Sequence, residues 1–361
     1  MSKALLTCIS GFGAKGPACF LLEAEDRRLL LDFGRGPDHD ALPDFDRIGR
    51  VDALVLSHGH RDHIGALPFL DQIGSPPVFA TEWLRRDLPD IAFGGVLSPN
   101  GDTEILGLPV RTGGSGHAPG GVWLHFGFGD GFLYTGDYCP SSLLYRYHAP
   151  PPAATVLVDA SYGSDDRNPA EGRQALLDIA RQGPCLLPGP ADGRGPEMAA
   201  FLHAAGIDVA MDDVHFRAVE HLCTEPEYVR SDMLAVLASL LEHARRVNAE
   251  ASPAGATIVA GASGTAGTAG ILLPLCRERP ELRIVFTGHL AVGSPGEALV
   301  KAGRAESLRW NVHPSFSETR ALLEAVYARR VVPAFAPREK LDALVSPLFQ
   351  TVLQGDVIEI L

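Results

Sequence analysis

The sequence predicts an α/β protein made of two parts, one of them inserted into the other. Residues 1–160 read as strand after strand, separated by Gly and Pro turns, with few helices between them. After Asn168-Pro169, helical stretches alternate with short apolar strands, which is the pattern of a parallel sheet. The last segment, from residue 300, is expected to return to the first part.

The elements expected in the first part are mainly short apolar strands. They are Leu5–Cys8, Ala18–Leu22, Leu29–Asp32, Ala53–Leu56, Val122–Phe126, Phe132–Thr135 and Thr155–Asp159. A helix is expected to start within Ile64–Leu70. In the second part we expect helices at Ala170–Arg181, Glu197–Ala205 and Pro226–Arg246, and strands at Cys185–Leu187, Thr257–Ala260 and Arg283–Thr287. Loops 149–154 and 251–255 look like connectors.

The composition describes an ordinary globular protein with a sizeable core. Of 361 residues, 46% are hydrophobic and 21% are charged. The six cysteines are scattered without close pairs, which argues against a disulfide framework and suits a reducing cytoplasm. No signal peptide is expected, and no apolar run reaches the roughly 18 residues of a membrane span.

The net charge of −13 is unfavourable for a protein that binds nucleic acid, because phosphate contacts dominate that affinity. Segment 301–340 is the exception, with eight basic and four acidic residues. We expect this segment, including Arg329 and Arg330, to contribute to nucleic-acid binding. The alternative is a solvated helical face.

The stretch LSHGHRDHIGALPFL, residues 56–70, places His58, His60, Asp62 and His63 within six positions after an apolar strand. Alternation predicts that the first three point the same way and that a tighter turn redirects His63. Imidazole nitrogen and carboxylate oxygen are ligands that zinc prefers. A polar turn with satisfied histidines is the alternative, but it would crowd charge and unpaired nitrogens at one point.

Two later positions complete a metal site. His117 lies in a Gly-rich loop before a strand, and Asp137 directly follows one. Together they add a third histidine for one metal and a carboxylate that can bridge two ions about 3.5–4 Å apart. Asp32, in LLLDFG, is expected to be a structural strand-end carboxylate.

These residues resemble the motif of the metallo-β-lactamase superfamily of binuclear hydrolases. The matching residues are His58, His60, Asp62, His63, His117 and Asp137. The resemblance implies an αββα sandwich in which the Asp62-His63 pair holds the second metal and the other three histidines hold the first. Asp137 would bridge both. Zinc is the expected ion, with manganese or iron as alternatives.

A further stretch, VLVDASYG at the end of strand Thr155–Asp159, resembles the β-CASP nucleases. The resemblance implies that residues 1–172 and 300–361 form the metallo-β-lactamase domain and that residues 173–299 form an inserted β-CASP α/β domain. Gly-rich stretches 261–270 and 287–296 look like turns of that insertion. They fit anion-binding loops or plain turns.

The subtype depends on two positions that hold histidines in most β-CASP enzymes. His313 fits the first, whereas the second, 22 residues later, is Phe335. RNA-processing members keep a histidine ligand there, while the Artemis and Apollo type of DNA cross-link repair exonucleases carry an apolar residue. The chain therefore resembles the DNA-repair type most closely, and its second metal is expected to bind more weakly. Another alignment would put Glu318 where the histidine belongs.

The resemblance implies a metal-dependent phosphodiesterase, a 5′ exonuclease with DNA favoured over RNA, that uses a metal-bound hydroxide. Asp62 would take a proton from the water, and His313, oriented by Asp159, would protonate the leaving oxygen. Asp159 could instead be a structural cap for the loop at Tyr162. The alternatives are an RNA-processing β-CASP ribonuclease, a small-molecule hydrolase and, disfavoured by the complete ligand set, an inactive scaffold.

Overall fold

The computed structural model describes residues 4–36, 40–247, 255–276 and 279–361. Contacts divide the chain into two compact units. Unit 1 comprises Met1–Pro140, Tyr147–Asp166 and His313–Leu361, and unit 2 comprises Ser141–Arg146 and Arg167–Val312. The domain boundaries expected from the sequence, 172/173 and 299/300, and the assignment of a β-CASP domain stay predictions.

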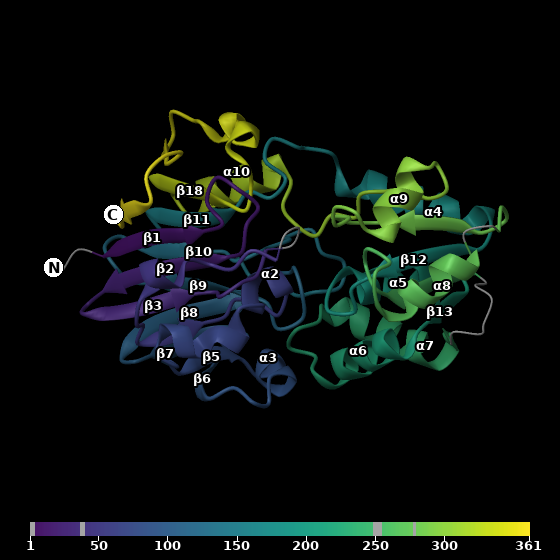
Figure 1. Cartoon of the computed structure of the whole chain (residues 1–361), viewed down its shortest axis with the longest axis horizontal. Helices are drawn as coiled ribbons and strands as arrows, with labels where there is room; N and C mark the ends of the chain where they lie inside the picture. Colours follow the sequence, from purple (N-terminus) through teal and green to yellow (C-terminus); the bar gives the residue numbers. More distant parts are fainter. Residues whose placement is uncertain (1–3, 37–39, 248–254, 277–278) are drawn as a thin grey trace. The chain divides into compact units, whose positions relative to one another are not determined.

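Unit 1 contains two sheets of seven strands each among the described residues, ordered β20-β1-β2-β3-β4-β5-β6 and β19-β18-β11-β10-β9-β8-β7 (Figure 1). The first sheet consists of β1 (Leu5–Ser10), β2 (Cys19–Ala24), β3 (Arg27–Leu31), β4 (Ala53–Val55), β5 (Val78–Thr81), β6 (Phe93–Leu97) and β20 (Val357–Glu359). The second consists of β7 (Asn100–Ile105), β8 (Leu108–Gly114), β9 (Val122–Phe126), β10 (Phe132–Tyr134), β11 (Thr155–Asp159), β18 (Arg330–Ala334) and β19 (Gln350–Thr351).

The two sheets share one apolar core. Leu22 and Val55 of the first sheet pack in the same cluster as Leu124, Leu157 and Val332 of the second, and all five are fully buried. Removing this apolar surface from water is the main stabilising contribution to a sandwich of this kind.

Short helices complete the layers of unit 1. They are α1 (Phe45–Ile48), α2 (Arg61–Ile64), α3 (Glu82–Asp87), α10 (Phe316–Ala325) and the 3-10 turns η1 (Leu67–Ile73), η3 (Arg338–Lys340) and η4 (Asp342–Leu344). On α10, Leu322 and Leu323 pack against Leu133 and Val156 in a second cluster, on the side of the sheet away from the main core. The αββα sandwich expected from the sequence is confirmed.

Unit 2 is built on one sheet, ordered β14-β13-β15-β12-β16-β17, in which every pairing is parallel. Its strands are β12 (Cys185–Gly189), β13 (Val209–Met211), β14 (Arg245–Arg246), β15 (Ala256–Ala260), β16 (Arg283–Phe286) and β17 (Glu306–Ser307). Its helices are α4 (Pro169–Gln182), α5 (Arg194–Ala204), α6 (Asp213–Thr224), α7 (Leu234–His243), α8 (Gly267–Cys276), α9 (Pro295–Lys301) and the 3-10 turn η2 (Ser231–Met233). The parallel α/β insertion predicted from the sequence is confirmed.

One expected helix differs from the structure, and some strands were not expected. The helix predicted at Pro226–Arg246 is wrong, because only α7 is α-helical and Arg245–Arg246 pairs with β13 as a strand. Strand pairing thus outweighs local helix propensity at this end. Strands β6 and β7 escaped prediction because their sequences, FGGVL and NGDTEI, are rich in Gly and polar residues.

Some expectations concern the ends and connections of the chain. Most of the connector predicted at 251–255 lies outside the described residues. All six cysteines are free thiols, and the cytoplasmic location stays a prediction. In the described part of the chain, no helix has both the length and the apolar character needed to cross a membrane.

Candidate metal centre

The His58–His63 stretch connects β4 to α2. His60 is the N-cap of α2, with extended backbone, and the helix begins at Arg61. The strand-like alternation predicted for His58, His60 and Asp62 is therefore wrong, because Asp62 and His63 lie inside the first helical turn. The helix expected within Ile64–Leu70 is also misplaced, since α2 ends at Ile64 and a 3-10 turn follows at Leu67.

Sheet topology brings the other polar groups to the same place. Strands β3 and β4 are parallel, as are β10, β11 and β18, so the carboxyl ends of neighbouring strands meet at one edge. Asp137 follows β10 and Asp159 ends β11. His117 lies in the loop that joins β8 to β9, which are antiparallel partners.

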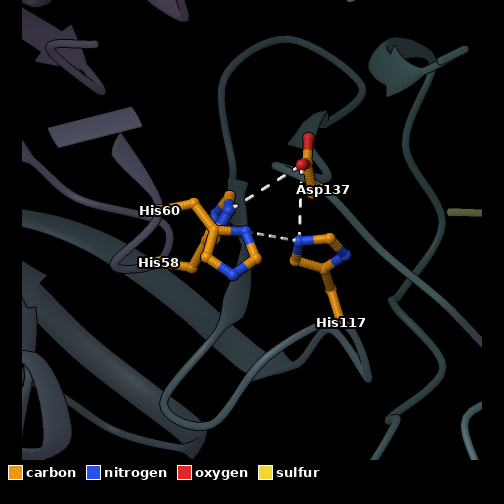
Figure 2. Close-up of side chains that lie close together, drawn as sticks. All are labelled: His58, His60, His117 and Asp137. Atoms are coloured by element: carbon orange, nitrogen blue, oxygen red, sulfur yellow. Dashed lines mark hydrogen bonds and ion pairs between the residues drawn. The ribbon is translucent and has the colours of Figure 1, made fainter. Parts of the chain in front are cut away.

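A first group of potential ligand atoms consists of His58, His60, His117 and Asp137, all within 4.8 Å of one another (Figure 2). His117 Nε2 lies 3.4 Å from Asp137 Oδ2 and 2.9 Å from His60 Nδ1. His58 Nε2 lies 3.8 Å from the same Asp137 oxygen.

A second group of this kind consists of Asp62, His63 and Asp137. His63 Nε2 lies 3.2 Å from Asp137 Oδ1, the carboxylate oxygen that the first group does not contact through His58 or His117. One carboxylate thus presents a different oxygen to each group. The structure therefore brings together all six residues that the sequence nominated as ligands.

Two buried atoms in this cluster have unmet bonding capacity. Among the described residues, His58 Nε2 and Asp137 Oδ1 have no hydrogen-bond partner, although His58 is 1% exposed and Asp137 is 4% exposed. Leaving such atoms unsatisfied is costly, and native interiors rarely do so. A divalent cation would satisfy both, so the donor set fits the metal that the sequence predicts.

Asp32 fixes the orientation of His63. The buried Asp32 accepts hydrogen bonds from the Ser57 backbone and hydroxyl, each at 2.7 Å, and from the Tyr134 hydroxyl. Its Oδ2 also lies 2.7 Å from His63 Nδ1, which leaves Nε2 facing Asp137. The sequence had predicted a purely structural role for Asp32. The signal for its second role was its position at the end of β3, beside the histidine-bearing strand end.

The histidines and carboxylates of the cluster shift one another's pKa. Burial, reinforced by the neighbouring His63 and His60, holds the pKa of His58 well below its usual value. Burial opposes a charge on His63 too, but the carboxylates of Asp137 and Asp32 outweigh it and raise the pKa of His63. A neutral His58 is the form that binds a metal.

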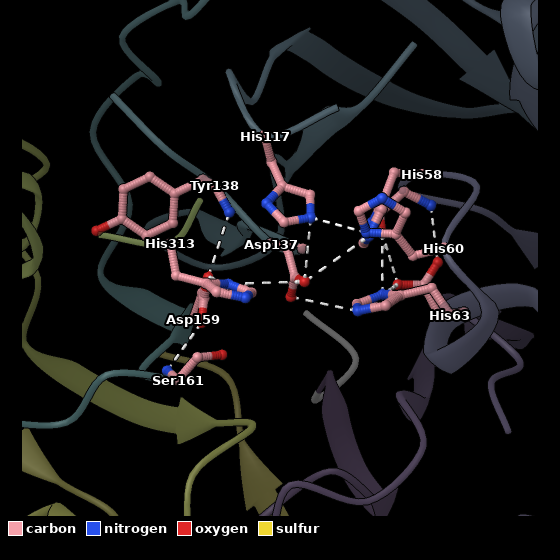
Figure 3. Close-up of polar contacts among 12 residues, drawn as sticks. His58, His60, His63, His117, Asp137, Tyr138, Asp159, Ser161 and His313 are labelled. Atoms are coloured by element: carbon pink, nitrogen blue, oxygen red, sulfur yellow. Dashed lines mark hydrogen bonds and ion pairs between the residues drawn. The ribbon is translucent and has the colours of Figure 1, made fainter. Parts of the chain in front are cut away.

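A third group, Asp137, Asp159 and His313, adjoins the first two (Figure 3). His313 Nδ1 lies 2.8 Å from Asp159 Oδ2 and 3.7 Å from Asp137 Oδ2. The other Asp159 oxygen accepts the Ser161 backbone N–H at 2.9 Å. Asp159 therefore both orients His313 and caps the loop that carries Tyr162, so the two roles that the sequence offered coexist.

Burial acts to lower the pKa of His313, whereas the carboxylates of Asp159 and then Asp137 act to raise it. The carboxylates outweigh burial, so the pKa of His313 is raised. Its ring also lies 5.2 Å from that of Tyr162, edge to face. The carboxylates beside His313 thus stabilise its protonated form relative to a free histidine.

Phe335 lies against the second group. It follows β18 in a left-handed conformation, φ 64°, and its ring packs edge to face on His63 with centroids 5.1 Å apart. An apolar ring therefore packs against His63, one residue of the second group. Glu318, the residue favoured by the alternative alignment, instead accepts the Ser315 backbone N–H at 2.7 Å in a capping box.

The basic pair Arg329 and Arg330 lies away from these groups. Arg330 is opposite Thr155 at the start of the parallel β11–β18 pair, whereas Asp159 is opposite Ala334 at its end. Four strand residues separate these ends by roughly 13 Å. Arg329 forms an ion pair with Asp130. The structure thus gives this pair a structural partner rather than a position at the cluster.

One buried polar pair in unit 2, Asp212 and His215, was not expected from the sequence. Asp212 caps α6 and lies 2.7 Å from His215 Nδ1, and it also accepts the Ala260 backbone N–H at 2.7 Å. This pair ties the ends of β13 and β15 together. The Gly-rich stretches 261–270 and 287–296 lead into α8 and α9, and their anion-binding role stays a prediction.

Comparison with known proteins agrees with this geometry. Residues 13–171 match the family model of the metallo-beta-lactamase superfamily. This region is therefore similar to that superfamily. It carries all six nominated ligand positions, from His58 to Asp137, and also Asp159.

Two curated relatives extend the similarity beyond that region. The chain is 28% identical over 247 residues to the transcription termination factor FttA of Cenarchaeum symbiosum, covering 55% of this chain and 38% of that protein. It is 24% identical over 245 residues to the endoribonuclease YSH1 of Kluyveromyces lactis, covering 54% of this chain and 32% of that protein. The chain thus spans well under half the length of both relatives.

A solved structure shares the fold over the whole chain. It is a protein of unknown function from Enterococcus faecalis, with a TM-score of 0.62 and 14% sequence identity, and the similarity covers 99% of this chain and 100% of that one. At this identity the likeness concerns the fold alone. None of these three proteins is named as a DNA cross-link repair exonuclease.

Proposed function

We propose that the protein is a metal-dependent nuclease of the β-CASP type that cleaves RNA. The observation that carries this proposal is the buried donor cluster in which Asp137 presents one oxygen to each of two ligand groups. Shared carboxylates of this kind are typical of two-metal phosphodiesterases. The cluster supports metal-dependent hydrolysis, and the relatives favour RNA as the substrate.

We propose RNA as the substrate, whereas the sequence alone favoured DNA. The sequence favoured DNA because Phe335 occupies the position of a histidine. That preference rests on one residue, whereas the relatives include an endoribonuclease and a transcription termination factor. The RNA-processing alternative is therefore the better supported of the two hypotheses. Cleavage from the 5′ end, as opposed to internal cleavage, is part of the proposal.

In this proposal three histidines would hold the first ion and a His–Asp pair would hold the second. The ligands are His58, His60 and His117 for the first ion, Asp62 and His63 for the second, and Asp137 for both. This donor set suits zinc, with manganese or iron as alternatives. When bound, such ions lower the pKa of water and neutralise charge on phosphate oxygens.

Two side chains of the protein would transfer the protons of the reaction. His313 is placed to give a proton to the leaving sugar oxygen, because Asp159 holds its Nδ1 and raises its pKa. The ring nitrogen opposite Nδ1 is then the donor. Asp62, half-buried beside His63, is available to accept a proton from the attacking water.

The test is digestion of end-labelled RNA and DNA of matched sequence by the zinc-loaded protein. We expect cleavage of RNA with a higher kcat/KM than DNA and loss of cleavage with a chelator. His313→Ala should lower kcat by about 10²–10⁴-fold while its metal content stays unchanged. Metal-loaded protein that leaves both polymers intact would contradict the proposal, and loss of metal from His313→Ala would make His313 a ligand.

A further inference from the structure

A short loop of unit 1 borders the ligand cluster, and the mechanism above gives it no part. Residues 11–18 connect β1 to β2. At the start of this loop, the Gly11 carbonyl accepts the Phe335 backbone N–H at 2.7 Å, next to Ala334, the strand partner of Asp159. The loop is therefore fixed to the end of β18, beside the end of β11 that carries Asp159.

The other end of the loop is fixed to the second ligand group. The Ala18 backbone N–H donates to the Asp62 carbonyl at 2.8 Å. Gly34 closes this junction tightly, since a Cβ there would lie 1.6 Å from the Asp62 carbonyl oxygen. The loop thus runs along the rim of the cluster from Asp159 to Asp62, with Lys15 near its middle.

Lys15 is a half-buried cation that has no anionic partner among the described residues. It forms no ion pair with any residue in the described part of the chain, and its charge reaches His313, where it acts to lower the pKa. Partial burial of an ammonium group costs free energy unless an anion or hydrogen-bond acceptors compensate it. By contrast, Lys301 in unit 2 is largely exposed and pairs with Glu297 at 2.8 Å.

A second cation, Arg338 of η3, packs against the same loop. The Arg338 guanidinium stands 5.8 Å from the centre of the Phe12 ring, and a Cβ on Gly13 would meet Arg338 Nε at 2.8 Å. Arg338 is exposed and, like Lys15, forms no ion pair among residues 4–36, 40–247, 255–276 and 279–361. Lys15 and Arg338, which have no carboxylate partner in the part of the chain that the structure describes, therefore lie beside a cluster proposed to hold a scissile phosphate.

We propose that loop 11–17 and Arg338 form a phosphate-binding site for the substrate strand, next to the position of the scissile phosphate. Lys15 neutralises one backbone phosphate, and Arg338 binds another through its planar guanidinium, which suits phosphate oxygens. The inference rests on the proposed function and deepens it, because it gives an acidic chain a local site for an RNA backbone.

The experiment measures kcat and KM on a short single-stranded oligoribonucleotide at several salt concentrations, and its affinity by fluorescence anisotropy. For Lys15→Ala and Arg338→Ala we expect weaker binding, a KM raised about tenfold and kcat little changed. The slope of log affinity against log salt should fall by about 0.7 for each phosphate that is no longer neutralised. Lys15→Arg should retain most of the affinity.

Arg181→Ala is the control, since it removes one exposed cation from the last turn of α4, outside segment 301–340. If the wild type cuts RNA while Lys15→Ala and Arg338→Ala behave like Arg181→Ala, the phosphate site is wrong and the proposed function stands. If the wild type binds RNA through Lys15 but never cuts it, the proposed function fails and the phosphate site stands. A fall in kcat alone, with KM and salt slope unchanged, also overturns the binding role.

Discussion

At the scale of single residues, Asp137 is the most consequential side chain in the cluster. It contacts His117 through Oδ2 and His63 through Oδ1, so that its replacement affects both ligand groups. We expect Asp137→Asn to reduce activity more than His63→Ala and to lower occupancy at both metal sites. Metal analysis of the two variants, alongside their rates, checks this. Equal reductions would mean that Asp137 does not bridge.

Asp32 is expected to affect the second metal site through His63. Because its carboxylate fixes the His63 ring through Nδ1, Asp32→Asn should weaken the second metal by about 10–100-fold while leaving the first in place. Competition with a chromophoric chelator measures both affinities. Asp52→Asn is the control, since that carboxylate accepts the exposed Arg28 backbone N–H at the other end of β4. Unchanged affinity in Asp32→Asn would reduce Asp32 to a purely structural role.

The residue types of the ligand cluster could be predicted from the sequence, but their directions could not. Spacing and chemistry nominate His58 to His63, His117 and Asp137, and the structure brings them together. The start of α2 at Arg61 decides where Asp62 points, and the sequence offers no Ser, Thr, Asp or Asn cap to reveal that start. Helix boundaries without such a cap are the weakest part of a prediction from sequence.

At the scale of elements, α10 holds His313 in place. Ser315, two residues after His313, caps this helix by accepting the Glu318 backbone N–H at 3.3 Å, and Glu318 reaches back to the Ser315 N–H. Ser315→Ala should therefore destabilise unit 1 by about 0.5–2 kcal/mol. Denaturant unfolding measures this change in the free energy of unfolding, with the exposed Ser164→Ala as the control. A variant as stable as that control would show that packing alone fixes α10.

Pairing between distant elements explains what the sequence could not show. Asp32 and His63 are 31 residues apart, and they meet only because β3 and β4 lie side by side. Likewise, His313 reaches Asp159 because α10 leads into β18, the parallel neighbour of β11. Local patterns identify single strands and helices well, whereas such contacts depend on strand order, which no local pattern encodes.

At the scale of the whole molecule, metal binding should contribute to stability. His58 Nε2 and Asp137 Oδ1 are buried without hydrogen-bond partners among the described residues, so an ion that satisfies them favours the folded state. A metal present at about 1,000 times its Kd stabilises a protein by about 4 kcal/mol. We therefore expect chelation to lower the unfolding temperature and zinc to restore it. Scanning calorimetry would contradict this if the apo and zinc-loaded proteins melted together.

The net charge of −13 is a property of the whole chain, and it does not show where single charges lie in the fold. Taken alone, it argues against a nucleic-acid substrate, and the basic segment 301–340 is the exception that the sequence offers. In the structure, Arg329 is engaged by Asp130, and Lys15, outside that segment, stands beside the cluster. Where a charge lies in the fold therefore matters more than the total.

The central claim is that two metal ions bind on either side of Asp137. Anomalous diffraction from zinc-loaded crystals of the full chain tests it most directly. We predict two zinc peaks, one among His58, His60 and His117 and a weaker one beside Asp62 and His63, with Asp137 contacting both. A single fully occupied zinc, or zinc bound elsewhere while these side chains hold no ion, would contradict the claim.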